Sequence, residues 1–136
     1  MLQKTLVFIK PDGVKRKLVS EVLSRFEKRG FCFLGLKQLT IESQLADQHY
    51  QEHVDKAFYP SLKTFISSGP VVAFVLEGEE AVSVVREMVG ATDSTQAKPG
   101  TIRGDLSLSK GENIVHASDS PESAAREIAL FFPDLV

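Results

Sequence analysis

Three histidines are the first candidates in this sequence for a nucleophile or a metal ligand. Two of them, His49 and His53, fit the H-x-x-E-H pattern of one metallopeptidase class, and on a helix they would share a face. Such a short pattern arises by chance, and a third ligand would have to come from His116 or a carboxylate. We therefore interpret His49 and His53 as solvated side chains of a polar helix, with a metallopeptidase as the weaker hypothesis.

The third histidine lies in a short apolar segment, residues 113–118, just ahead of a helix that Ser120 caps. Strand alternation would place Ile114, His116 and Ser118 on one face. Glu127, on the helix, borders an apolar stripe, where a carboxylate usually needs a partner. A carboxylate bonded to one ring nitrogen leaves the other free as a nucleophile. The alternative is a core histidine bonded to a backbone carbonyl, and these residues alone favour neither interpretation.

The sequence contains no phosphate-binding loop of the G-x-x-x-x-G-K-[ST] type, no G-x-G-x-x-G turn and no protein-kinase signature. A nucleotide site would therefore have to hold phosphates with side chains. The candidates are Lys10, Arg86, Thr92 and Arg103. Arginine suits phosphate because its guanidinium can donate two parallel hydrogen bonds. Each of these residues taken alone is an ordinary surface residue.

Apolar periodicity outlines the elements that must position these side chains. Strands are expected at residues 5–9, 31–39, 71–76 and 113–117, and helices at 18–28, 42–53, 61–67, 79–89 and 121–132. Residues 11–13 are expected to form a turn. Residues 91–112 have no apolar period and are expected to form a long loop, which in a compact domain is usually either functional or disordered. This order predicts one α+β sandwich, a single domain over residues 1–136, with helices on one face of the sheet.

Composition excludes several classes of protein. The 136 residues carry 16 basic and 18 acidic side chains, and a formal net charge of -2 argues against a general nucleic-acid binder. Cys32 is the only cysteine, so no intrachain disulfide can form, and its apolar surroundings predict a buried, reduced thiol. The N-terminal segment resembles neither a signal peptide nor a membrane span, which predicts a cytoplasmic protein without membrane or nucleic-acid partners.

Four segments together resemble the signature segments of nucleoside diphosphate kinases, in the order and spacing of that family. They are Lys10-Pro11-Asp12-Gly13-Val14, Ser68-Gly69-Pro70-Val71, Pro99-Gly100-Thr101-Ile102-Arg103-Gly104-Asp105 and residues 113–123. The likeness runs from about Thr5 to Phe132. It implies a ferredoxin-like βαββαβ sandwich, an antiparallel sheet with helices packed on it.

The resemblance also implies a role for individual residues. His116 matches the histidine that accepts the phosphoryl group, on its pros nitrogen Nδ1, and Glu127, Ser118 and Tyr50 match the residues that support it. The nucleotide-binding matches are Lys10, Phe58, Arg86, Thr92, Arg103 and Asn113.

The family's reaction moves the γ-phosphate of ATP to a nucleoside diphosphate, such as GDP, UDP, CDP or a deoxy form, in two half-reactions. The resemblance implies Mg²⁺ bound through nucleotide phosphates and water, with no direct protein ligand. Stacking of the base on Phe58 would tolerate every base, because each has a π-face.

Assembly is expected to follow the family, as a tetramer or hexamer built from dimers. Val22, Phe26, Phe31 and Phe33 are candidates for a subunit contact. Lys17 and Ser20 stand where relatives often have glycine, Asp93-Ser94 replaces a common Asn-Pro pair, and the sequence stops early at Val136. Ser94 and the early stop predict an oligomer that dissociates more readily than those of long-tailed relatives.

Two further hypotheses come from other classes of protein. A phosphohistidine carrier domain would take its phosphate from another protein, but it would need no counterparts of Asn113 and Phe58. A ferredoxin-like RNA-binding module would need strand aromatics on a basic sheet face. Phe31 and Phe33 have the required parity, but the charge balance does not support it.

Overall fold

The computed structural model describes residues 1–135, so that Val136 lies outside the described residues. The strands are β1 (Leu2–Ile9), β2 (Cys32–Thr40), β3 (Pro70–Glu79) and β4 (Val115–Ala117). The helices are α1 (Pro11–Lys15), α2 (Val19–Arg29), α3 (Ser43–His49), α4 (Tyr59–Ile66), α5 (Ala81–Val89), α6 (Ile102–Leu106) and α7 (Pro121–Phe131), with 3₁₀ turns η1 (Ser94–Gln96) and η2 (Pro133–Leu135).

The four strands form one sheet in the order β2-β3-β1-β4, and each neighbouring pair is antiparallel. β1 lies in the middle of the sheet and pairs with β3 from Leu2↔Glu79 to Ile9↔Val72. β4 is short and pairs only with Val7–Ile9 at the end of β1. This strand order is that of a ferredoxin-like sandwich, as predicted. Within residues 1–135, no helix has the length and apolar character needed to cross a membrane.

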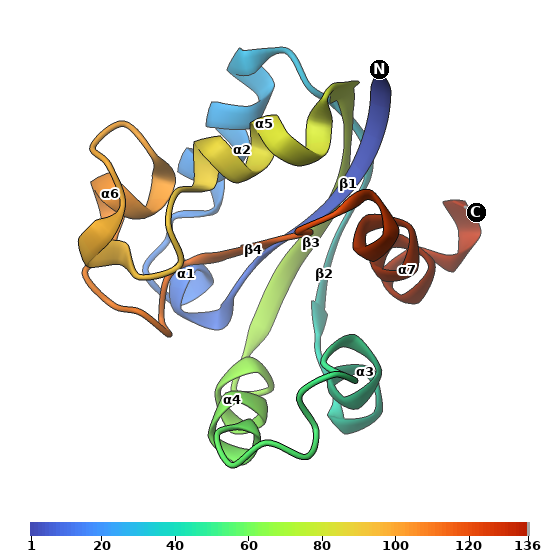
Figure 1. The fold of residues 1–136 in the computed structure, drawn as a ribbon, viewed down its shortest axis with the longest axis vertical. Helices are drawn as coiled ribbons and strands as arrows, with labels where there is room; N and C mark the ends of the chain where they lie inside the picture. The colour runs from blue at the N-terminus through green and yellow to red at the C-terminus, as the bar shows by residue number, and fades with distance from the viewer. Residues whose placement is uncertain (136) are drawn as a thin grey trace.

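Helices cover both faces of the sheet, so the prediction of helices on one face was wrong (Figure 1). Alternate residues of β1 enter two separate cores. Val7 and Ile9 pack with residues of α2 and α5, whereas Leu6 and Phe8 pack with residues of α3, α4 and α7. The cause lies in β1 itself, because its second half, Leu6–Ile9, is apolar at every position and must be covered on both sides.

Two short helices replace segments that were predicted to be irregular. Residues 11–13 begin α1, where Pro11 takes the first helical position and needs no N–H partner. In the predicted loop 91–112, α6 begins after Thr101, whose side chain accepts a hydrogen bond from the Gly104 N–H. A Cβ on Gly104 would lie 2.0 Å from the Lys98 carbonyl oxygen, so this turn requires glycine.

The predicted environments of several apolar residues need correction. Val22, Phe26 and Phe31 are buried in the core of the subunit and Phe33 packs against it, so they form no exposed contact surface. Cys32 is exposed rather than buried, because it lies on β2 at the edge of the sheet. The exposed apolar side chains of β2 are instead Leu34 and Leu36.

Within residues 1–135, the backbone has a positive φ at three non-glycine residues, which are Lys17, Glu80 and Ile114. Lys17 has φ 62°, the left-handed conformation that glycine adopts without strain, at the turn between α1 and α2. Ile114 has φ 75°, which is rare for a β-branched residue. Two bonds hold Ile114 there: its N–H donates to Asp12 Oδ2 at 3.0 Å, and its carbonyl accepts from the Lys10 N–H at 2.7 Å.

This strained residue changes which side chains share a face. The side chains of Ile114 and Val115 both pack into the core that contains residues of α2 and α5. The strand-like alternation of side chains between the two faces of the sheet therefore begins only at Val115. His116 and Ser118 therefore share a face, but the prediction that Ile114 lies with them was wrong. The unusual φ of Ile114 is the physical reason.

Candidate active site

A cavity of about 970 Å³ gathers most of the predicted site residues. Its walls come from the end of β1, the end of α3 and the turn after it, the turn before α4, α4 itself, α5, α6, the segment 109–113, β4 and α7. Nine of the ten predicted residues line it: Lys10, Tyr50, Phe58, Arg86, Thr92, Arg103, Asn113, His116 and Glu127. The tenth, Ser118, is fully buried behind Glu127.

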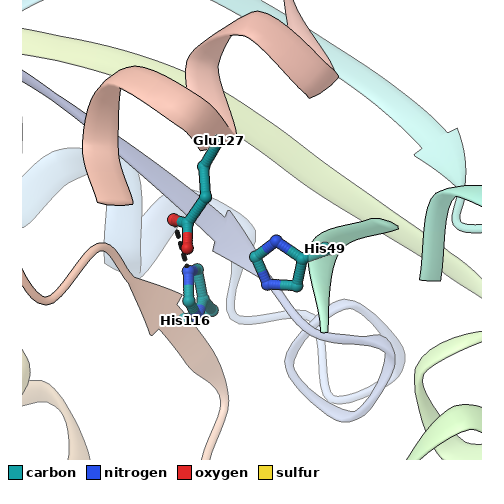
Figure 2. A group of neighbouring side chains, drawn as sticks. All are labelled: His49, His116 and Glu127. Atoms are coloured by element: carbon teal, nitrogen blue, oxygen red, sulfur yellow. Dashed lines mark hydrogen bonds and ion pairs between the residues drawn. The ribbon is translucent and has the colours of Figure 1, made fainter. Parts of the chain in front are cut away.

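His116 lies on β4, and its Nε2 is 2.9 Å from Glu127 Oε1 on α7 (Figure 2). The Ser118 hydroxyl donates to the same carboxylate oxygen at 2.7 Å. The α7 helix begins after Ser120, whose side chain accepts from the Ser123 N–H, and Pro121 occupies its first turn. With the start of α7 fixed in this way, the Glu127 side chain points toward β4. A neutral His116 ring that donates from Nε2 has its lone pair on Nδ1.

The ring of His116 is also held by packing. It stacks on Phe8 of β1, with ring centroids 4.8 Å apart and an interplanar angle of 22°. Phe8 is fully buried and in turn stacks on Phe131 of α7. Packing and hydrogen bonding together restrict the imidazole to one orientation, as a nucleophile requires.

Glu127 is a buried carboxylate that stays ionised. Burial acts to raise the pKa of the Glu127 carboxyl, but the hydrogen bonds with His116 and the Ser118 hydroxyl help to lower it below its usual value. The Arg126 guanidinium lies 3.7 Å from its other oxygen, Oε2. An ionised Glu127 accepts the Nε2 proton and fixes the tautomer of His116.

His49 is part of this site, contrary to the prediction of a solvated side chain. Only 4% of it is exposed, and its ring packs edge-on against His116 with centroids 4.7 Å apart. Burial is the main cause that lowers the pKa of His49 to about 3, so its ring is neutral. The sequence contained a signal for this burial that was misinterpreted. Leu45 and Ala46 are apolar residues of the same helix, and His49 follows them at i+4 and i+3, which places all three on one helix face.

His53 does not join the same cluster. It is partly buried and lies against Tyr50 and Phe58 at the other side of the cavity, with centroid distances of 6.4 and 5.6 Å. The side chains of His49 and His53, the pair of zinc ligands considered from the sequence, therefore do not come together in the structure. Tyr50 packs edge-on against His49, and burial raises the pKa of its hydroxyl well above the usual range.

The opposite wall of the cavity is cationic. The Lys10 ammonium donates to Asn113 Oδ1 at 2.7 Å, and the Asn113 amide donates to the carbonyls of Thr92 and Lys110. Burial, with the nearby charge of Arg103, lowers the pKa of Lys10 to about 8. Thr92 itself is exposed at the rim.

Arg103 is more buried, and forms more hydrogen bonds within the protein, than is expected of a phosphate-binding side chain at the surface. Its guanidinium donates to the carbonyls of Gly90, Asn113 and Val115, and only 4% of the residue is exposed. One hydrogen on each terminal nitrogen is uncommitted by these bonds. Burial and the charge of Arg86 lower the pKa of Arg103 to about 10. Arg86 reaches β4 from α5 and donates to the Ala117 carbonyl at 3.2 Å.

Phe58 lies at the mouth of the cavity and is 52% exposed, which is unusual for an aromatic side chain next to a fold's core. It precedes α4, and the Lys56 ammonium lies 5.8 Å from its ring centroid. One face of an exposed ring at a cavity mouth is available for stacking against a planar ligand.

Together these features define a ferredoxin-like domain with a carboxylate-bound histidine facing a cation-lined cavity. Comparison with known proteins gives the family. The family model described as "Nucleoside diphosphate kinase" matches residues 3–135. The chain belongs to the nucleoside diphosphate kinase family. The predicted family and the prediction that the chain is a phosphotransferase are confirmed.

Relatives and solved structures agree over nearly the whole chain. Nucleoside diphosphate kinase from a Nocardioides species is 57% identical over 99% of this chain and 100% of its own length. That from Sulfolobus acidocaldarius is also 57% identical, over 98% and 92%. The enzyme of Aquifex aeolicus superimposes with a TM-score of 0.96 at 42% identity, covering 99% of this chain and 98% of its own. The Halobacterium salinarum enzyme, solved in complex with CDP, gives 0.94 at 46% identity, covering 97% and 88%.

Proposed function

We propose that this chain transfers the γ-phosphate of ATP, or another nucleoside triphosphate, to a nucleoside diphosphate through a phosphohistidine at His116 Nδ1. The observation that carries this proposal is the Ser118–Glu127–His116 chain of hydrogen bonds beside a cation-lined cavity. Glu127 holds the proton of His116 on Nε2, which leaves the Nδ1 lone pair to attack phosphorus. The diphosphate product leaves, and a second diphosphate attacks the phosphohistidine in reverse, which gives ping-pong kinetics.

The cations have the role of neutralising and positioning the transferred phosphate. Phosphoryl transfer requires little covalent help beyond these two effects. Lys10, Arg103 and Arg86 of α5 all line the cavity. Arg103 can use its uncommitted hydrogens to bind phosphate oxygens. Asn113 holds Lys10 in place and is assigned to the sugar hydroxyls. Thr92, at the rim, is assigned to the outer phosphates.

The donor set fits a Mg²⁺ ion that arrives on the nucleotide. Mg²⁺ prefers six oxygen ligands and keeps several waters. The carboxylate beside the nucleophile, Glu127, already accepts bonds from His116 and Ser118, and the side chains assigned to the phosphates include the cations Lys10, Arg86 and Arg103. We assign the ion to the phosphates and water, with no direct protein ligand. When bound, it supplies further neutralisation of phosphate charge.

Base selection is expected to be broad. Phe58 offers a π-face and no hydrogen-bonding groups, so that purines and pyrimidines can stack alike. The relative from Halobacterium salinarum was solved with the pyrimidine nucleotide CDP. GDP, UDP, CDP and their deoxy forms are therefore the proposed acceptors, without nucleic-acid or membrane partners.

The proposed assembly is a dimer that builds into tetramers or hexamers. β2 forms one edge of the sheet and exposes Leu34 and Leu36, and two such edges can cover each other in a two-fold contact. That contact would also cover Cys32. The cytoplasm remains the predicted location.

Labelled ATP provides the direct test. The wild type, incubated with Mg²⁺ and a mixture of diphosphates, should form labelled GTP, UTP and CTP, and should carry acid-labile label when no acceptor is present. His116→Ala should lose both signals, whereas His53→Ala, a matched histidine replacement, should keep the label on the protein. Thermal unfolding verifies that His116→Ala is folded. Near-normal turnover by folded His116→Ala would refute the assignment.

A further inference from the structure

Two histidines and a carboxylate meet at one place in the cavity. One potential ligand atom from each of His49, His116 and Glu127 lies within 4.8 Å of the other two. The three residues come from α3, β4 and α7, and Figure 2 shows them facing one another. The mechanism above uses His116 and Glu127 and gives His49 no chemical role.

His49 has unused capacity to bind. It is buried, and its Nδ1 has no hydrogen-bond partner among the described residues. Such orphaned polar atoms are uncommon in protein interiors and point to a function. The Arg126 guanidinium donates to the carbonyls of Gln48 and His49, which fastens the end of α3 to α7. His49 is thereby held beside Glu127.

The spacing suits a tetrahedral metal ion. Zinc binds imidazole nitrogen and carboxylate oxygen at about 2.0–2.2 Å, so neighbouring ligand atoms in a tetrahedron lie roughly 3.3 Å apart. The His116 Nε2–Glu127 Oε1 distance is already 2.9 Å. An ion fits between these atoms when His116 Nε2 and Glu127 Oε1 move slightly apart and the His49 ring moves toward them. Two imidazoles and one carboxylate form the ligand set of open zinc sites, whereas Mg²⁺ prefers oxygen alone.

We infer that His49, His116 and Glu127 form a Zn²⁺ site whose occupation inhibits phosphoryl transfer. The ion takes the Nε2 lone pair of His116 and an oxygen of the ionised Glu127. The ring proton that Nε2 carried then resides on Nδ1, so no proton is gained or lost by the neutral ring. The Nδ1 lone pair that would attack phosphorus is no longer available. The inhibition rests on the proposed function, whereas the metal site does not.

Direct binding is the first part of the test, because it does not depend on activity. The purified chain, stripped of metal, is titrated with Zn²⁺ against a chromophoric chelator. One Zn²⁺ per chain should bind, and His49→Ala, His116→Ala and Glu127→Gln should each weaken binding at least tenfold. His53→Ala should bind normally, and so should Cys32→Ser, which removes the exposed thiol as an alternative zinc ligand. Unfolding curves identify any variant that is not folded, and Co²⁺ absorption of the wild type reports imidazole ligation.

Activity is the second part. With Mg²⁺ in excess, Zn²⁺ should suppress phosphorylation of His116 with the same midpoint as binding, and a zinc-selective chelator should restore it. Zinc that binds equally well to His49→Ala and the wild type would overturn the site. Binding at these residues with unaltered phosphorylation would overturn the inhibition. A wild type that binds zinc but never phosphorylates His116 would refute the proposed function and leave the metal site standing.

Discussion

Individual side chains set the electrostatics of the cavity, and Lys10 is a group whose charge changes in an accessible pH range. Its ammonium lies beside Asn113 at the end of β1, with Arg103 close by. Burial and this neighbouring cation favour the neutral amine, which is why the pKa of Lys10 falls to about 8. A bound phosphate would oppose this effect by favouring the charged form.

The first prediction is an alkaline loss of substrate capture. Because the pKa of Lys10 is lowered, the ammonium is present below about pH 8 and is lost as the pH rises through that value. The kcat/KM for a nucleoside diphosphate should therefore fall about tenfold per pH unit above this point. A profile from pH 6 to 10 measures it. In Lys10→Arg, whose guanidinium stays charged, the remaining activity should not show this loss. A wild-type profile that stays flat to pH 10 would contradict the assignment.

The second prediction concerns the exposed ring of Phe58. Phe58→Ala should weaken binding of all nucleotides by a similar amount, about 1–3 kcal/mol, because stacking is the contact removed. Binding of ADP, GDP, UDP and CDP by calorimetry measures it. Phe58→Tyr, which keeps the π-face, serves as the matched control. A loss confined to purines would show that base edges are recognised elsewhere in the cavity.

The sequence predicted which residues belong to the site better than it predicted whether each residue is buried. The family resemblance from Thr5 to Phe132 gave His116, Glu127 and the cationic residues Lys10, Arg86 and Arg103, because the order of matching residues along the chain is visible without a structure. His49 and Cys32 were misplaced because burial depends on what packs against a residue. The polar sequence of α3 hides the contact that its last residue makes with β4, and Cys32 follows the apolar Phe31 but lies on an unpaired edge.

At the level of elements, periodicity found every strand and every long helix. It missed α1 and α6, since each has five residues and neither is long enough to show a helical repeat. These two helices rely on tertiary contacts and caps. The conformation of Ile114 was equally hidden, because the bonds to Asp12 and Lys10 come from residues about 100 positions away.

The third prediction uses the turn between α1 and α2. Lys17 has φ 62°, a conformation that costs a non-glycine residue about 1–2 kcal/mol. Lys17→Gly should therefore raise the free energy of unfolding by roughly 0.5–1 kcal/mol, after the entropy lost by glycine is included. Lys15→Gly, two residues earlier in α1, should lower it by a similar amount. Urea unfolding of both variants measures the difference. Equal destabilisation by the two changes would show that the turn stores no strain.

At the level of the whole molecule, the unpaired edge of β2 leads to the fourth prediction. Leu36 is 53% exposed there, and Leu36→Lys should convert the proposed oligomer to smaller species at micromolar concentration. Light scattering across a dilution series measures the mass. Leu2→Lys makes the same change on β1, which β3 separates from β2, and should leave the mass unaltered. A wild-type chain that is monomeric at all concentrations would refute the assembly.

The central position of β1 also has a consequence for how the chain folds during synthesis. β1 is made before both of its neighbours, and its pairing Leu2↔Glu79 must wait for 77 more residues. At about 5–20 residues per second, the wait is on the order of 4–15 s. During that time the apolar run Leu6–Ile9 has no sheet to join and is a natural target for chaperones. Glu127 is made later still, so His116 gains its carboxylate partner only after all four strands have been made.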